Sequence, residues 1–276
     1  MSNTFRFNAV IHKIILLLFI SFLFFNAKIY AGTSVWQGPY LGAYIGGGFG
    51  NNHLSSDAGA VTSTSYFSTA ADIAAVNRAG SSVQDPASAV GGIQLGHDWT
   101  WKQMVYGAVL DYGLLPLNSS KNIHNMTYPD NSNNYSVYTS MSTNWLFTLR
   151  GRLGYQTSLY WPSLLYITGG MAMSQINVTN NFIDNSSYAG VGRTQSAENQ
   201  IGWTAGAGIE LLAFGHASLD LEYLFVRLPS VKIMSTISNT QAGFGVPVQS
   251  LTNDFTTTGK FRAGLLKLGL NYRFDE

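Results

Sequence analysis

The sequence lacks cysteine, has few charges and, beyond its first 25 residues, contains no long apolar run. Without cysteine the chain can form neither a disulfide nor a thiolate metal site. Charged residues make up 11% of the chain and the formal net charge is +1, so a strongly acidic or basic partner such as nucleic acid is not expected. No later stretch reaches the length of about 18 apolar residues that a membrane-spanning helix needs.

The N-terminal segment has the layout of a secretory signal peptide. Arg6, His12 and Lys13 precede an apolar run at 14–25, and Ala31 closes a short stretch of polar and small residues. The run is about a dozen residues long, short of the roughly 20 that a transmembrane helix requires. We therefore predict a signal peptide over residues 1–31, cleaved after Ala31, and a mature domain over 32–276. An uncleaved anchor helix is the alternative.

The remainder of the chain shows strict alternation of side-chain character. Leu41, Ala43 and Ile45 share one face of an extended segment, while Tyr40 and Tyr44 occupy the other. A period of two is the signature of a β-strand, and segments of about 10–13 residues match tilted strands that cross a membrane. The predicted strands lie near 39–50, 88–100, 104–115, 143–155, 164–176, 200–212, 216–228 and 261–274. The sequence thus predicts an all-β fold, an eight-stranded antiparallel up-and-down transmembrane β-barrel.

Charges on the polar faces distinguish a membrane barrel from a water-soluble one. A soluble barrel turns its apolar face inward, whereas a membrane barrel turns it to lipid and fills its lumen with the polar face. The charges in these strand interiors nearly balance in sign, as ion pairs in a narrow lumen would. We predict a lumen ion-pair network of Asp111, Arg150, Arg152, Glu210, Glu222 and Arg273, with Asp220 and Lys267 on the same faces. A soluble barrel with solvated charges is the alternative.

The connections between the predicted strands alternate in length. Three are short, whereas four are long and rich in Ser, Thr, Asn and Gly. The long ones, predicted as loops, cover 51–87, 116–142, 177–199 and 229–260. Outer-membrane barrels have short periplasmic turns and long external loops. This asymmetry predicts extracellular loops and places both termini in the periplasm.

Aromatic residues gather near the predicted strand ends. Rings with one apolar and one polar edge prefer the interface between membrane and water. We predict an aromatic girdle made of Trp99, Trp101, Tyr106, Trp145, Tyr155, Trp161, Trp203, Tyr272 and Phe274. Most of these would lie on the periplasmic side, with Trp145 and Trp203 nearer the outer rim. Ordinary core aromatics are the alternative.

Glycine-rich strand motifs follow one another along the whole mature chain. They read WQGPYLG at 36–42, GGIQLG at 91–96, LRGRLGY at 149–155, LYITGG at 165–170, GAGIE at 206–210 and GLNYRF at 269–274. In this order they resemble the small outer-membrane β-barrel proteins of proteobacteria, which include OmpA, OmpX and the Opa-like surface antigens. The resemblance implies an outer-membrane location, contact with lipid and lipopolysaccharide, and insertion by the barrel assembly machinery. Such barrels usually end on an aromatic residue, whereas here Asp275 and Glu276 follow Phe274.

The resemblance leaves three functions to be weighed. An eight-stranded barrel has room only for side chains, which favours a structural, surface-exposed protein of antigen or adhesin type with a plugged lumen. Its loops would offer a site for a host or envelope ligand. A narrow porin is the alternative, because glycines on the inner faces could leave a path for small solutes. A lipid-modifying enzyme is more remote, since the histidines are scattered and no catalytic, metal or cofactor motif is present, so we predict no enzyme and no cofactor.

Overall fold

The computed structural model describes residues 34–158, 161–185, 190–239 and 251–274. The predicted signal peptide and its cleavage site at Ala31 lie outside these residues. The described strands are β1 (Gly38–Asp57), β2 (Ser82–Gln84), β3 (Ala87–Trp101), β4 (Met104–Thr127), β5 (Asn134–Ser158), β6 (Pro162–Asp184), β7 (Val191–Phe214), β8 (Ala217–Arg227), β9 (Val231–Ser238) and β10 (Thr252–Arg273), with one helix, α2 (Ala70–Gly80). Within the described ranges no helix has the length and apolar character needed to cross a membrane.

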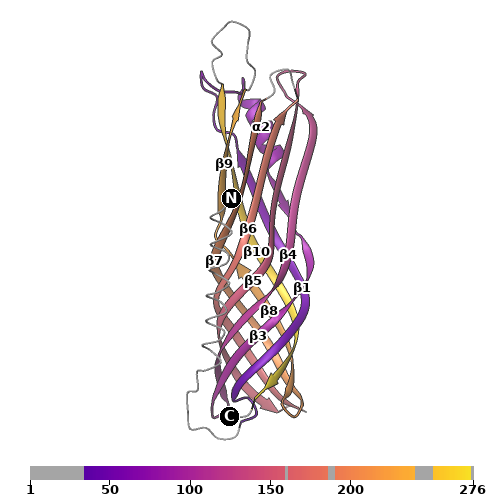
Figure 1. Ribbon diagram of the computed structural model, residues 1–276, viewed down its shortest axis with the longest axis vertical. Coiled ribbons are helices and arrows are strands. Elements are labelled where there is room, and N and C mark those ends of the chain that lie inside the picture. The colour runs from indigo at the N-terminus through magenta and orange to yellow at the C-terminus, as the bar shows by residue number, and fades with distance from the viewer. Residues whose placement is uncertain (1–33, 159–160, 186–189, 240–250, 275–276) are drawn as a thin grey trace, which may run out of the picture.

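Eight of the strands close into a ring. β1, β3, β4, β5, β6, β7, β8 and β10 each pair antiparallel with the next, and β10 pairs back with β1 (Figure 1). The short β2 extends the sheet beside β1, and β9 extends it beside β10. The predicted eight-stranded antiparallel up-and-down β-barrel is therefore confirmed.

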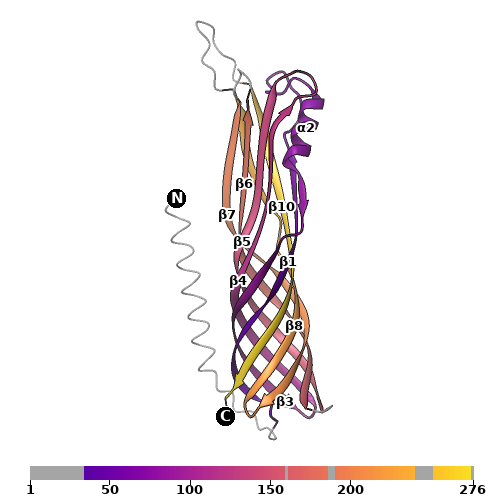
Figure 2. The same cartoon turned by 90° about the vertical axis from the view of Figure 1, so that its right-hand side faces the viewer.

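The two ends of the barrel differ. At one end, here called the turn end, two residues join β3 to β4 and two join β7 to β8. Gly215 has a φ of 51° in the second of these turns, a left-handed conformation that suits glycine. The first and last strands also meet at this end, where Tyr40 lies opposite Arg273. The opposite end, here called the tip, carries α2 (Figure 2).

The strands are much longer than predicted, and most of the segments predicted as loops are strand. β5 has 25 residues and β4 has 24, whereas about 9–11 residues suffice to cross a bilayer. Within the described residues, the predicted loops at 51–87, 116–142, 177–199 and 229–260 contain strand extensions, α2 and tip connections such as 128–133. Apolar and polar residues still alternate through these extensions, but here the apolar residues face inward and the polar ones face outward. Because the outward residues are often Ser, Thr or Asn, the segments resemble loops in the sequence.

The inner face of β10 displays this reversal. Near the turn end its inward residues are polar, as at Asn271 and Lys267, and both are buried. Further toward the tip the inward residues become apolar, at Leu265, Ala263 and Phe261. The interior therefore changes from a charged lumen to an apolar core along a single strand.

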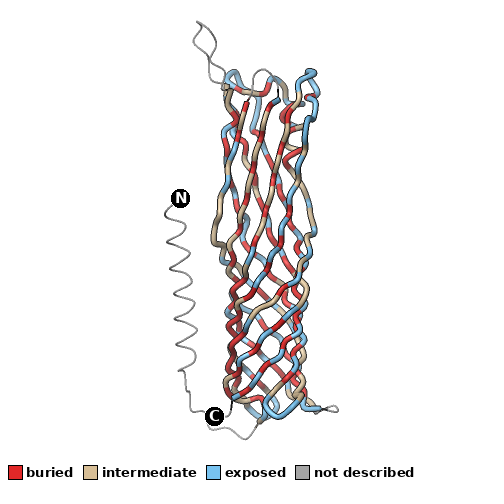
Figure 3. The backbone as a smooth tube through the Cα atoms, turned by 45° about the vertical axis from the view of Figure 1, so that its right-hand side comes forward, coloured by how far each residue is buried: buried red, intermediate tan, exposed pale blue. Residues whose placement is uncertain are grey.

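The outer face of β10 changes in the opposite sense. Leu270, Leu268 and Leu266 are about half exposed near the turn end, whereas Arg262 and Lys260 are exposed further toward the tip. Outward apolar residues recur at the same level on the neighbouring strands, and together they form an apolar belt around the turn half of the barrel. Buried and exposed residues alternate along these strands (Figure 3). The turn half thus has the polarity of a membrane barrel and the tip half that of a water-soluble one.

The core of the tip half consists of two apolar clusters. The middle cluster includes Leu117, Ile176 and Phe261, contributed by three strands. The tip cluster combines Phe182 and Phe255 from the strands with residues of α2. These clusters close the interior above the charged lumen.

Helix α2 completes the wall of the barrel at the tip. Thr69 caps its N-terminus by accepting a hydrogen bond from the backbone N–H of Asp72 (3.2 Å). Ile73 and Val76 are buried in the tip cluster, and Lys121 of β4 donates to the carbonyl of Arg78 at the other end of the helix. A Cβ on Gly80 would lie 2.7 Å from the Ser56 hydroxyl, so glycine permits the close approach of α2 to β1.

Candidate functional site

Nine charged side chains from six strands are buried inside the turn half of the barrel. They are Asp98 on β3, Asp111 on β4, Arg150 and Arg152 on β5, Glu210 on β7, Asp220 and Glu222 on β8, and Lys267 and Arg273 on β10. Burying an unpaired charge costs several kcal/mol, so this lumen is stable only if its charges are paired and hydrogen-bonded.

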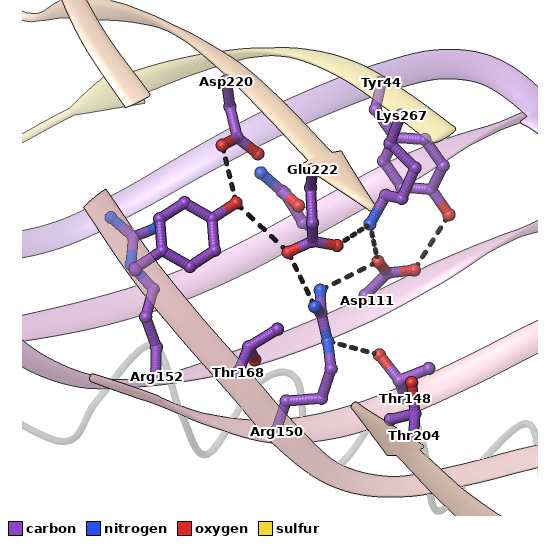
Figure 4. Close-up of polar contacts among 12 residues, drawn as sticks. Tyr44, Asp111, Thr148, Arg150, Arg152, Thr168, Thr204, Asp220, Glu222 and Lys267 are labelled. Atoms are coloured by element: carbon purple, nitrogen blue, oxygen red, sulfur yellow. Dashed lines mark hydrogen bonds and ion pairs between the residues drawn. The ribbon is translucent and has the colours of Figure 1, made fainter. Parts of the chain in front are cut away.

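Four of these side chains form a closed ring of ion pairs, the upper ring, on the side of the middle apolar cluster. Arg150 donates to Glu222 (2.7 Å) and to Asp111 (3.3 Å), and Lys267 also pairs with both carboxylates (Figure 4). The Tyr44 hydroxyl donates to the second oxygen of Asp111 (2.9 Å). Each carboxylate in the upper ring is thus shared by two cations.

Four more form a second ring, the lower ring, closer to the turn end. Arg273 pairs with Asp98 and with Glu210, at 3.0 Å in each case. Arg152 contacts the same two carboxylates, with its guanidinium 3.3 Å from Asp98. Both rings therefore alternate two cations with two carboxylates, so their charges cancel locally.

Tyr166 links the two rings. Its aromatic ring lies 4.3 Å from the Arg152 guanidinium, and its hydroxyl donates toward Glu222 (3.2 Å) and Asp220 (2.6 Å). The lumen holds five carboxyl groups and four cations. Asp220 is the carboxyl group without an ion pair among the described residues, and it accepts the hydrogen bond from Tyr166 instead. Arg152 also donates to the Tyr40 hydroxyl at 3.3 Å.

The structure brings all six predicted lumen residues inside the barrel but divides them between the rings. Arg150 joins Asp111 and Glu222, whereas Arg152 and Arg273 join Glu210. Asp98 is missing from the predicted set, although every second residue of β3 faces inward and Asp98 therefore shares the inward face with Gln94 and Gly96. That alternation was the signal that could have identified it.

The predicted girdle residues lie near the ends of the apolar belt, with different exposure. Trp101, Tyr106, Tyr155, Trp161, Tyr272 and Phe274 are exposed near the turn end, and Trp203 is exposed on the tip side of the belt. Trp99 is partly buried and stacks on Tyr106, and Trp145 is partly buried beside Tyr112. Trp36, by contrast, is buried inside, 4.9 Å from the Arg273 guanidinium.

An open cavity of about 320 Å³ lies at the tip. Tyr66, Phe67 and Tyr128 supply aromatic walls, and Asp72 and Asp184 supply carboxylates. The hydroxyls of Tyr66 and Tyr128 both donate to one oxygen of Asp184, at 2.6 and 2.9 Å. The cavity therefore presents flat apolar faces beside fixed polar groups, which is the usual composition of a small-molecule site.

The two tyrosines are held in their neutral form. Burial, and then the neighbouring Asp184 carboxylate, raises the pKa of both Tyr66 and Tyr128 above the ordinary tyrosine value. Since the unfolded chain would release these protons first, their contribution to stability is complete below about pH 10 and declines at higher pH.

The histidines of the described part of the chain are spread over the barrel. Within the described residues no group of three His, Asp or Glu side chains is placed to hold a metal ion. His53 and His124 are exposed at separate places, and His216 lies in a turn beside Tyr272. Eight of the nine buried lumen charges are engaged in the two rings instead.

Parts of the chain are similar in sequence to known proteins. No family model matches the chain. It is 27% identical over 141 residues to a 22 kDa outer membrane protein of Rhizobium leguminosarum bv. viciae, covering 51% of this chain and 53% of that protein. The chain is similar to bacterial outer-membrane proteins. It is also 32% identical over 80 residues to a 25 kDa outer-membrane immunogenic protein of Brucella abortus, covering 29% of this chain and 31% of that protein.

These relatives confirm the predicted resemblance to outer-membrane proteins and support an outer-membrane location. The chain spans about half the length of the Rhizobium protein and about a third of the Brucella protein. The similarity thus concerns part of each relative.

Solved outer-membrane barrels also align with most of the chain, but loosely. OprG of Pseudomonas aeruginosa aligns with a TM-score of 0.39 and 11% identity, covering 86% of this chain and 97% of that one. Ail of Yersinia pestis aligns with a TM-score of 0.36 and 10% identity, covering 86% of this chain and 99% of that one. The protease OmpT of Escherichia coli aligns with a TM-score of 0.37 and 10% identity, covering 90% of this chain and 99% of that one. Likeness at this level carries no information about function.

Proposed function

We propose that this chain is a surface-exposed outer-membrane protein whose closed barrel holds a β-structured rim above the membrane. The observation that carries the proposal is the reversal of polarity along the strands, with an apolar belt outside the turn half and an apolar core inside the tip half. A barrel wholly within lipid would need no polar outer face on its tip half. The tip half is therefore suited to water, as a rigid stalk for a recognition surface.

In this proposal the turn end lies in the periplasm and the tip outside the cell. Both ends of the barrel domain then lie in the periplasm, and the mature domain is 32–276. The apolar belt contacts outer-membrane lipid and lipopolysaccharide, and the predicted girdle residues lie at its two borders. The barrel assembly machinery would insert the chain, with Tyr272 and Phe274 as its terminal aromatic residues.

The proposed role of the rim is recognition, of antigen or adhesin type, rather than catalysis. The tip cavity supports it, because three aromatic walls and two carboxylates face an opening of about 320 Å³. The ligand would be a host or envelope molecule with a flat apolar part and polar groups. We favour a binding role over a lipid-modifying activity because aromatic rings and hydrogen-bonded carboxylates line the cavity.

The proposed protein differs from a narrow porin in having a lumen that is closed to ions. Both ion-pair rings and the two apolar clusters lie in series along the interior, so an ion would have to displace several of them to pass. We expect the refolded mature chain to give no steady conductance steps in planar bilayers.

A variant offers the matched control for this measurement. Replacing Arg152 and Glu210 by serine removes one cation and one carboxylate of the lower ring but leaves the upper ring and both apolar clusters, so it too should stay closed. Steady channels of high conductance in the wild-type chain would reject the closed lumen and favour the porin.

A further inference from the structure

Five cationic or titratable side chains gather on the outer surface just beyond the apolar belt. They are His53 on β1, Arg227 at the end of β8, Lys232 on β9, and Lys260 and Arg262 on β10, here called the collar patch. All five are exposed and face outward. On β8 the outward Leu219, Leu221, Tyr223 and Phe225 lead directly to Arg227, so the patch begins where the belt ends.

The strand register places these side chains next to one another. Arg262 lies directly opposite Arg227, and Lys260 lies directly opposite His53. Lys232 lies opposite Thr258, one outward position from Lys260. Directly opposed residues have their Cβ atoms about 4.5–5.5 Å apart, and like charges in that position destabilise a sheet. Among the described residues, no carboxylate forms an ion pair with Arg227 or Arg262 that would offset their repulsion.

Carboxylates within the described residues do not neutralise the patch. None of its members forms an ion pair or side-chain hydrogen bond there, in contrast to the cations of the lumen. Asp85, the carboxylate at its edge, accepts a hydrogen bond from Asn51 instead (2.8 Å). Asp57 and Asp254 lie several residues further toward the tip.

The patch is also confined to one side of the barrel and is hollowed. A cleft of about 190 Å³ is lined by Asn51, His53, Lys260 and Arg262. On the opposite side, outward residues of β5 and β6 at and above this level are neutral, as at Ser140 and Thr179. If these charges served only to keep the outer surface soluble in water, we would expect them on all strands at this level.

We propose that the collar patch is a binding site for the phosphate groups of an anionic glycolipid in the outer leaflet. The belt fixes the level of the glycolipid acyl chains, and the patch lies at the adjacent level, where headgroup phosphates meet water. Arginine matches phosphate oxygens through paired N–H donors, and lysine adds point charge. Bound phosphate would also relieve the repulsion between Arg227 and Arg262. The inference depends on the proposed membrane placement of the belt.

The test compares lipid A that carries its phosphates with dephosphorylated lipid A. Refolded mature protein in mild detergent is titrated with each, and binding is measured by native mass spectrometry and by the salt dependence of the dissociation constant. In the test variant the substitutions are Arg227→Gln, Lys260→Gln and Arg262→Gln. Three exposed charges removed near a membrane surface should weaken binding of phosphorylated lipid A by roughly tenfold or more. Binding of the dephosphorylated lipid should not change.

A control variant removes equal charge elsewhere, by the substitutions Arg78→Gln, Lys102→Gln and Arg193→Gln, all at exposed positions away from the patch. It should bind phosphorylated lipid A as the wild type does. Equal loss in test and control variants, or no preference of the wild type for the phosphorylated lipid, would overturn the inference. Competition by millimolar inorganic phosphate would also overturn it, because the site would then recognise a free anion.

Heat-modifiable gel mobility distinguishes this outcome from failure of the proposed function. A chain that folds without detergent, and shows no folded barrel in it, would contradict the membrane placement itself. A folded barrel that fails to discriminate the two lipids contradicts only the collar patch.

Discussion

Replacing Arg150 by methionine should lower the free energy of unfolding by about 3–5 kcal/mol, the typical loss when one partner of a buried ion pair is removed. Arg150 is fully buried, and its guanidinium pairs with both Asp111 and Glu222. Its removal leaves two carboxylates to the single ammonium of Lys267. Urea titration of the barrel in lipid vesicles, followed by tryptophan fluorescence and gel mobility, measures this loss.

Two further variants show whether charge pairing is the cause. Adding Glu222→Gln to the Arg150 variant removes the excess carboxylate, so the double variant should be less destabilised than the sum of the single ones. Asp220→Asn removes a carboxyl group that has no ion pair among the described residues, and it should cost about 1 kcal/mol or less. If the Arg150 variant unfolded like the wild type, the buried network would contribute nothing to stability.

Replacing Phe182 by alanine should destabilise the tip by about 3–5 kcal/mol, because a large buried ring leaves a cavity. Phe182 is fully buried and packs against Phe67 and Phe255, with ring centroids 5.8 and 6.3 Å apart. The middle apolar cluster separates this site from the ion-pair rings. The tip should therefore open to protease while the turn half keeps its heat-modifiable mobility.

The neighbouring Ile183 provides the control on the same strand. Its side chain alternates with that of Phe182 and is only partly buried, so Ile183→Ala should leave protease resistance nearly unchanged. Simultaneous loss of tip and turn half in the Phe182 variant would show that the barrel unfolds as one unit, against the separation of its two cores.

The turn half could be predicted from the sequence because its alternation has the polarity of a membrane barrel. Leu266, Leu268 and Leu270 alternate with Lys267 and polar neighbours, and that pattern determines which residues of the strand face inward. In the tip half the same period of two carries polar residues outward. Segments such as 177–181 were therefore expected to be loops, although Val178 packs into the core and Asn180 is buried.

Helix α2 escaped prediction for a different reason. Its 11 residues include four alanines before Val76 and only a narrow apolar stripe, and it lies within a segment rich in Ser and Thr. Tertiary packing in the tip cluster, rather than its own propensity, accounts for most of its stability.

The charged lumen could be predicted as a set of residues but not as a set of pairs. Alternation places Arg150 and Arg152 on the same face of β5. Which carboxylate each one meets depends on the stagger between strands that are far apart in the sequence, and this stagger assigns them to different rings. The tyrosine link through Tyr166 likewise depends on that stagger.

The reversal of polarity is tested most directly by single cysteines, because the natural chain has none. Leu114 and Ser120 both face outward on β4, on the belt and beyond it, and Lys102 lies in a turn at the opposite end. In intact cells a membrane-impermeant maleimide should label Ser120→Cys but neither Leu114→Cys nor Lys102→Cys. After the outer membrane is opened, Lys102→Cys should become labelled as well. Labelling of Leu114→Cys in intact cells, or protection of Ser120→Cys, would contradict a membrane barrel that continues as a water-exposed stalk.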